Sequence, residues 1–183
     1  MSTLIPLLSE AELPPELAAR LKSRVERLGY LGDFFRYTAH QPKALMSFLE
    51  FTEDLKRALP NNLTEVIALS VGALMNNSYE RVQHERLSLA LGYGKEWVRE
   101  LLSLEAQGEG AVSKQETSVQ RLTIAVVTRR GKDCAAELEA VIRAFGPATA
   151  IAILMLIGRY VTHGLIANTL DLAPPVPSPL QQR

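Results

Sequence analysis

The sequence predicts an all-α fold, and two observations carry that prediction. No long run alternates apolar and polar residues, which is the pattern of a half-buried strand. Apolar residues instead recur at helical spacing, as in the stripe from Leu17 to Leu28. With 183 residues, 47% of them hydrophobic, the chain can bury a core and suits one domain better than two. We expect this domain over residues 1–175 and an extended proline-rich tail over residues 176–183.

Proline, glycine and capping residues predict the helix boundaries in the first half. A Pro-Pro pair opens a helix from about Glu16, and Gly29 ends it. A short segment over residues 34–39 precedes a long helix over residues 42–60.

The next two helices hold the residues that matter most for function. Asn61 and Asn62 are expected to supply the N-cap of a strongly apolar helix, which the polar run 76–78 interrupts. Ser78 is expected to cap the following helix, which Gly92 closes.

In the second half, a helix over residues 95–104 precedes a glycine-rich loop. Ser113 and Glu116 then form a capping-box pattern that starts a helix ending at Gly131. One more helix follows, and Pro147 begins the last and most apolar one, which runs to about Leu170. Its apolar stretch is about half of the roughly 20 residues that a membrane span needs, so we expect a buried helix.

Charge and cysteine content exclude several functions. Lysine plus arginine equals aspartate plus glutamate, at 20 each, so no net charge attracts nucleic acid or an anionic membrane. The single cysteine, Cys134, excludes an internal disulfide and a cysteine-based metal cluster, and it fits the reducing cytoplasm. Residues 1–10 carry no lysine or arginine, so they do not resemble a signal peptide.

One constellation of acid and base groups looks arranged for chemistry. Glu80 and His84 are four residues apart, so they share a helix face, where a carboxylate raises the pKa of a histidine and fixes its tautomer. An ordinary surface pair is the alternative. Glu65 precedes an apolar run and could be a partly buried carboxylate, or it could close a capping box with Asn62.

The other polar candidates have plainer alternatives. Tyr79 could donate a hydrogen bond to a substrate or pack its ring at a helix start. His40 and His163 are expected to be structural, and Cys134 to be an inert thiol. No H-E-x-x-H spacing occurs, so no metal site is predicted.

The stretch from Glu65 to Gly92 resembles the core motif of the carboxymuconolactone decarboxylase and alkylhydroperoxidase D-like (AhpD-like) superfamily. In the peroxidase branch a glutamate precedes a C-x-x-C pair and a histidine, and these positions fall on Glu65, Asn77, Glu80 and His84. In the decarboxylase-like branch the region reads E-Y-E-W-x-x-H, which Tyr79, Glu80 and His84 match. A looser resemblance extends over residues 34–175.

The chain departs from the family pattern at three positions. Asn77 and Glu80 replace both redox cysteines, so the resemblance places the chain in a cysteine-less branch. A thiol peroxidase cycle needs an attacking thiolate and a resolving thiol, so that activity is not expected. Arg81 replaces the usual tryptophan and changes the polarity of the pocket.

The resemblance implies a symmetric homo-oligomer, commonly a trimer or hexamer, with the active site near a subunit boundary. The leading hypothesis is a cofactor-free acid-base enzyme that decarboxylates or isomerises a small carbonyl, lactone or carboxylate compound. The alternatives are a peroxiredoxin-type or alkylhydroperoxidase-type antioxidant protein and a non-catalytic oligomeric binding module. The predicted catalytic residues are Glu65, Glu80 and His84; the predicted substrate-binding residues are Asn77, Tyr79 and Arg81, the last as a carboxylate anchor or a solvated side chain.

Overall fold

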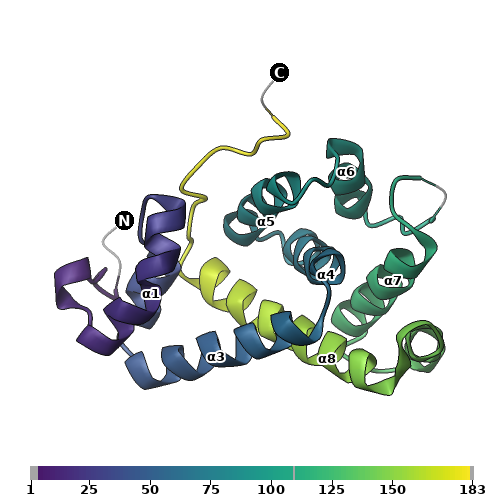
Figure 1. The fold of residues 1–183 in the computed structure, drawn as a ribbon, viewed down its shortest axis with the longest axis horizontal. Coiled ribbons are helices and arrows are strands. Elements are labelled where there is room, and N and C mark those ends of the chain that lie inside the picture. The colour runs from purple at the N-terminus through teal and green to yellow at the C-terminus, as the bar shows by residue number, and fades with distance from the viewer. Residues whose placement is uncertain (1–3, 109, 182–183) are drawn as a thin grey trace. The chain divides into compact units, whose positions relative to one another are not determined.

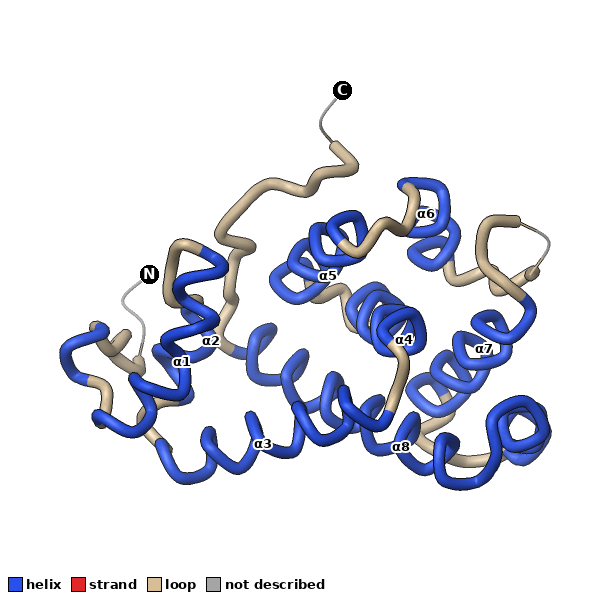
Figure 2. Tube along the Cα trace, viewed as in Figure 1, coloured by secondary structure: helices blue, strands red, loops and turns tan. Residues whose placement is uncertain are grey.

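The computed structural model describes residues 4–108 and 110–181, and these form helices and loops without a strand (Figure 1). The all-α prediction is therefore confirmed, as the secondary-structure trace shows (Figure 2). The chain divides into two compact units, which meet in sequence between Asp54 and Leu55.

The first unit contains the short 3-10 helix Glu10–Glu12, α1 (Pro15–Leu28), α2 (Asp33–Thr38) and most of α3 (Pro42–Ala58). Gly29 ends α1 in the left-handed conformation, at φ 79°, as predicted. The buried side chains of this unit include Leu17, Leu21, Phe34, Leu45 and Leu49.

The second unit is built around α4 (Asn61–Leu74). This helix packs against α5 (Ser78–Ala90), α6 (Lys95–Ser103), α7 (Lys114–Thr128) and α8 (Ala135–Thr169), and it lies between them in Figure 1. Residues 63–72 of α4 are all buried. Because every face of α4 meets protein, a polar side chain on it must find its partners within the unit.

Two caps differ from the prediction. Helix α4 begins directly after Pro60, whose extended backbone (φ −65°, ψ 152°) makes Asn61 the first helical residue. Asn62 instead donates from Nδ2 to Oε1 of Glu116 on α7, at 2.9 Å. Glu65 is therefore not the third residue of a capping box.

Asn77, rather than Ser78, caps α5. Its Oδ1 accepts the backbone N–H of Glu80 at 3.2 Å. The Ser113 to Glu116 capping box at the start of α7 is confirmed.

Helix α8 consists of two helical segments. Gly146 has φ 82° and ψ 167°, and Pro147 follows it, so the helix is interrupted where the sequence predicts a new start.

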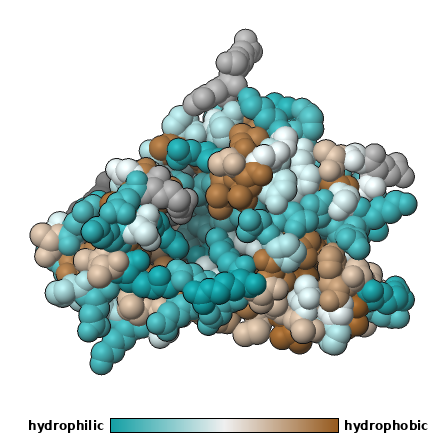
Figure 3. Space-filling model, in the orientation of Figure 1, coloured by the Kyte–Doolittle hydropathy of each residue, from teal (hydrophilic) through white to brown (hydrophobic). Residues whose placement is uncertain are grey.

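The apolar segment of α8 is buried on one face only, which corrects the prediction of a buried helix. Ile153 and Leu156 are buried, whereas Ile151, Met155 and Leu165 are 56%, 45% and 57% exposed. In the space-filling view, apolar surface gathers where α7 and α8 lie (Figure 3). Among the described residues, α8 alone is long and apolar enough to cross a membrane, although 33% of its apolar window is buried in the protein.

The proline-rich tail follows α8 without forming a helix and is held at Ser178. This side chain is buried, and its Oγ donates to the carboxylate of Glu85 on α5. The same carboxylate lies 3.2 Å from Nε of Arg81. Residues 171–181 are therefore attached to the second unit through α5.

Candidate active site

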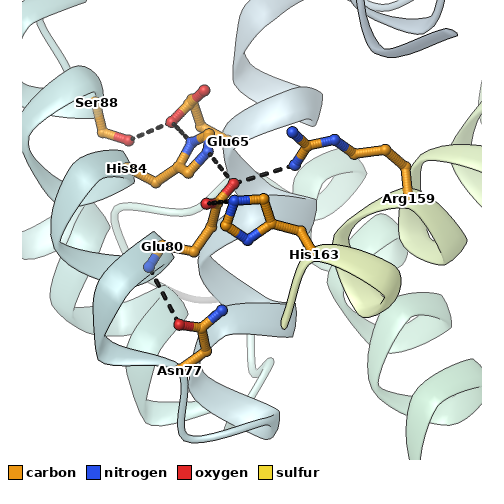
Figure 4. A network of polar contacts seen from close by, with 7 residues as sticks. All are labelled: Glu65, Asn77, Glu80, His84, Ser88, Arg159 and His163. Carbon is orange, nitrogen blue, oxygen red and sulfur yellow. Dashed lines mark hydrogen bonds and ion pairs between the residues drawn. The ribbon is translucent and has the colours of Figure 1, made fainter. Parts of the chain in front are cut away.

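The first part of the site joins α4 to α5. Asn77 caps α5, and Glu80 and His84 leave this helix one turn apart (Figure 4). His84 Nδ1 lies 2.7 Å from Oε2 of Glu65 on α4, and Ser88 Oγ donates to the same oxygen at 3.3 Å. His84 Nε2 lies 3.4 Å from Oε1 of Glu80.

The structure thus brings together Glu65, Glu80 and His84, the three predicted catalytic residues. All three are buried, with residue exposures of 2%, 8% and 6%. Their catalytic roles stay predictions, because proximity alone does not establish turnover.

Helix α8 completes the site with two residues that the sequence analysis did not assign to it. Arg159 Nη1 donates to Oε1 of Glu80 at 3.1 Å, and His163 Nε2 lies 2.9 Å from Oε2. Arg159 and His163 are themselves four residues apart in an otherwise apolar helix. That i, i+4 polar pair was the signal available in the sequence, since two polar side chains on one face of a buried helix need a shared partner.

A close helix contact allows α8 to reach Glu80. A Cβ on Gly164 would lie 2.7 Å from Sδ of Met75 and 3.5 Å from Nδ2 of Asn77. One turn later, Asn168 Nδ2 donates to the backbone oxygen of Met75 at 2.8 Å. The glycine lets α8 lie against the turn between α4 and α5, next to the cap of α5.

Aromatic rings surround the polar groups. Tyr79 stacks on His163, with centroids 6.1 Å apart and an interplanar angle of 27°. Tyr160 meets His84 edge-on at 5.2 Å, and its ring also lies 4.5 Å from the guanidinium carbon of Arg159. These rings exclude water, and charge interactions strengthen where water is excluded.

The contacts of His84 define its charge. A carboxylate only accepts hydrogen bonds, so each ring nitrogen that faces one must carry a proton. Burial alone would lower the pKa of His84, but Glu65 and Glu80 together raise it above the ordinary value of 6.5. These contacts favour the protonated, imidazolium form of His84.

The pKa values of Glu80 and His163 are shifted in directions that fit a positive charge on His84. Burial would raise the pKa of the Glu80 carboxyl, but His163, His84 and Arg159 hold it well below its ordinary value. Burial lowers the pKa of His163, and Arg159 and His84 lower it further, which Glu80 offsets only in part. The negative charges of Glu65 and Glu80 are thus balanced by the positive charges of Arg159 and His84, and His163 remains neutral.

The predicted substrate-binding residues have structural partners. Asn77 caps α5, and Tyr79 is buried against His163. Arg81 pairs with Glu85, whereas Arg159 is the cation that contacts Glu80, so the predicted role of Arg81 as a substrate anchor stays a prediction.

The remaining candidates lie apart from this network. His40 Nε2 lies 2.8 Å from the backbone oxygen of Pro6, a structural contact. Cys134 stands at the N-terminal end of α8, where its Sγ donates to the backbone oxygen of Lys132 at 3.1 Å. Within the described ranges, no three His, Cys, Asp or Glu side chains are arranged to hold a metal ion.

Comparison with known proteins identifies the fold. The debrominase Bmp8 in its apo form superposes with a TM-score of 0.82 at 15% identity, over 96% of this chain and 94% of that one. A cysteine-to-alanine variant of Bmp8 in complex with 2,3,4-tribromopyrrole gives 0.81 at 15% identity, over 94% and 92%. The AhpD core of an uncharacterised peroxidase-related protein from Ralstonia eutropha JMP134 gives 0.77 at 18% identity, over 92% and 90%.

No protein-family model and no curated protein matches the sequence. The chain therefore has the AhpD-like fold, and the resemblance drawn from Glu65 to Gly92 is confirmed at the level of the fold. A shared fold does not fix an activity, so the function has to be argued from the site.

Proposed function

We propose that this protein is an acid-base enzyme that moves a proton on a small carbonyl, lactone or carboxylate compound, in a decarboxylation or isomerisation. One observation carries the proposal: both ring nitrogens of the buried His84 face carboxylate oxygens. Such an imidazolium holds a proton ready for transfer in surroundings that exclude water.

The distances suggest which proton moves. Nδ1 lies 2.7 Å from Glu65, a short charge-assisted contact that orients the ring. Nε2 lies 3.4 Å from Glu80, longer than a well-formed hydrogen bond. The Nε2 proton is therefore the one to pass to the substrate atom that gains an electron pair, which leaves His84 neutral with its Nδ1 proton directed at Glu65.

The exposure of the site favours a small substrate. The side chains of His84 and Glu80 are 8% and 11% exposed, so only a narrow edge of the pair reaches the surface. A compound of a few carbon atoms could reach that edge without unfolding the helices around it.

The test uses a panel of small β-keto acids, ketones and lactones, followed by NMR in D2O for deuterium incorporation or loss of CO2. The informative variant is His84→Asn, because the asparagine amide can replace Nδ1 as the donor to Glu65 while the Nε2 proton is lost. Turnover should fall on the order of 100 to 10,000-fold in this variant. Equal turnover by His84→Asn would refute the proposal, and compounds that bind without turnover would favour a binding module.

The alternative function is peroxide reduction, which the description of one relative suggests. Cys134 is the single cysteine of this sequence, so a dithiol cycle within the chain lacks its second thiol. Peroxide reduction with an added dithiol donor, abolished by Cys134→Ser, would favour this alternative.

We also propose that the protein is a homo-oligomer that uses the exposed face of α8. The exposed positions Ile151, Met155, Gly158, Thr162 and Leu165 are spaced by four, three, four and three residues. This is the repeat by which one helix packs along another. The face points away from Arg159 and His163, so a second copy could pack there while the network stays intact.

A further inference from the structure

Helix α8 places a separate donor on each oxygen of Glu80. Arg159 donates to Oε1, which His84 also faces, whereas His163 lies 2.9 Å from Oε2. Because an ionised carboxylate only accepts, Nε2 of His163 must be the protonated nitrogen of this ring. Figure 4 shows the two side chains reaching the carboxylate from neighbouring turns of the helix.

This division of the two oxygens constrains how Glu80 can rotate. If Oε2 lacked a donor, the carboxylate could turn and offer Arg159 both oxygens, since a guanidinium readily binds a carboxylate in a bidentate way. His84 Nε2 would then lose the oxygen that faces it. The contact of His163 Nε2 with Oε2, at 2.9 Å, opposes this rotation.

We propose that His163 is a positioning residue: its Nε2–H holds Oε2 of Glu80, which keeps Oε1 facing Nε2 of His84 and keeps the carboxylate ionised. This inference rests on the proposed function, in which the Nε2 proton of His84 is the one transferred. The protonation state of the neutral His163 fits this role, because a neutral imidazole can donate one hydrogen bond without adding a charge.

Packing is the competing explanation for His163. Its ring stacks on Tyr79 and its side chain is 3% exposed, so His163 could serve only to fill space in the core. Two substitutions separate these roles. His163→Phe keeps a ring beside Tyr79 and removes the donor, whereas His163→Gln keeps an N–H at the position of Nε2 and removes the ring.

The experiment is a pH titration of the Glu80 carboxyl carbon by 13C NMR, assigned by comparison with Glu80→Gln. The charged or titratable groups around Glu80 are Arg159 and His163 from α8, His84 from α5 and, beyond His84, Glu65 from α4. The two His163 variants leave the other groups in place and differ in the donor at Oε2 and in the ring beside Tyr79.

The expected result is that the Glu80 pKa rises further toward its ordinary value of 4.5 in His163→Phe than in His163→Gln, because both variants lose the charge of a protonated histidine and only His163→Gln keeps the donor. An unchanged pKa in both variants, an equal rise in both, or a rise in His163→Gln alone would each overturn the positioning role. The titration needs no substrate, so its outcome is independent of whether the proposed enzymatic function holds.

A second variant covers the case in which His163→Phe does not fold. Tyr79→Leu removes the stacked ring and leaves the His163 donor in place, so the Glu80 pKa should stay depressed. A rise in Tyr79→Leu would assign the effect to packing and overturn the proposal. Once a substrate is known, the acid limb of the pH profile of kcat should move to higher pH in His163→Phe and return in His163→Gln.

Discussion

The Oε2 atom of Glu65 lies 2.7 Å from Nδ1 of His84, and 19 residues separate the two in sequence. Glu65 stands near the start of a helix whose residues 63–72 are all buried, where an unpaired carboxylate would be strongly destabilising. His84 and Ser88, both from α5, donate to it and so satisfy the charge. The pair therefore links the central helix to the helix that holds the rest of the site.

Replacing the charge at position 65 should change the titration of His84. In Glu65→Gln the amide oxygen can still accept from Nδ1, but the negative charge that raises the His84 pKa is gone. The pKa of His84 should fall, as measured by NMR of the ring resonances against pH. The matched control is Glu116→Gln on α7, another buried glutamate, whose side chain contacts Asn62. An unchanged His84 titration in Glu65→Gln would contradict the assignment.

The local half of the site could be predicted from the sequence. Glu80 and His84 are one helical turn apart, and the family resemblance pairs them with Glu65, so short spacing and one known motif place all three. Asn77 falls on a redox-cysteine position of the motif and is predicted to bind substrate, and in the structure its side chain caps α5.

The α8 half of the site could not be predicted in this way. Glu80 and Arg159 are 79 residues apart, and no local pattern indicates which face of α4 or α5 the last helix will meet. The close approach depends on Gly164, which the sequence shows only as one more glycine. The exposed face of α8 could not be predicted for the same reason. Composition alone does not reveal that α4 and α5 cover one side of this helix.

The two histidines should give the free energy of unfolding a maximum near pH 6.5. The raised pKa of His84 stabilises the fold fully below about 6.5, its unfolded value, and that stabilisation is lost as pH rises through the folded pKa. The lowered pKa of His163 acts oppositely, because the unfolded chain gains a proton below about 6.5 that the folded protein does not. Urea unfolding at a series of pH values measures both limbs.

Single substitutions assign each limb of this curve. His84→Asn should remove the alkaline decline, and His163→Gln should remove the part of the acid decline that lies between its folded and unfolded pKa values. His40→Gln is the control, since this exposed histidine contacts only the N-terminal segment in the described contacts. An alkaline decline that persists in His84→Asn would show that another group causes it.

Removal of the buried cation should destabilise the protein far more than removal of an exposed one on the same helix. Arg159→Met leaves Glu80 without its permanent positive partner and should cost about 3–5 kcal/mol, the usual effect of breaking a buried ion pair. Arg143→Met breaks a pair with Glu139 that is 69% and 67% exposed, and it should cost about 1 kcal/mol or less. Urea unfolding compares the two, and equal losses would contradict the role of Arg159.

A charge on the exposed face of α8 should dissociate the oligomer. Met155→Asp places a carboxylate in the middle of the stripe from Ile151 to Leu165, where a second copy would have to bury it. Light scattering should give more than one subunit for the wild type and a mass near 20 kDa for the variant. Leu91→Asp is the matched control, because Leu91 is a 41% exposed leucine at the end of α5. A monomeric wild type at micromolar concentration would remove the proposal.

The last prediction distinguishes the catalytic role of the His84 Nε2 proton from the contribution of His84 to stability. The structure buries His84 between two carboxylates, so His84→Ala should destabilise the protein by about 3–5 kcal/mol as well as abolish turnover. Loss of activity in that variant would therefore be ambiguous.

His84→Asn resolves the ambiguity. Its amide can donate to Glu65 as Nδ1 does, so most of the stability should remain, while turnover should still fall on the order of 100 to 10,000-fold because no proton stands at Nε2. Cys134→Ser should match the wild type in both measurements, since the thiol contacts only the backbone oxygen of Lys132 in the described structure. A stable His84→Asn with full activity, together with an inactive Cys134→Ser, would transfer the chemistry from the imidazolium to the thiol.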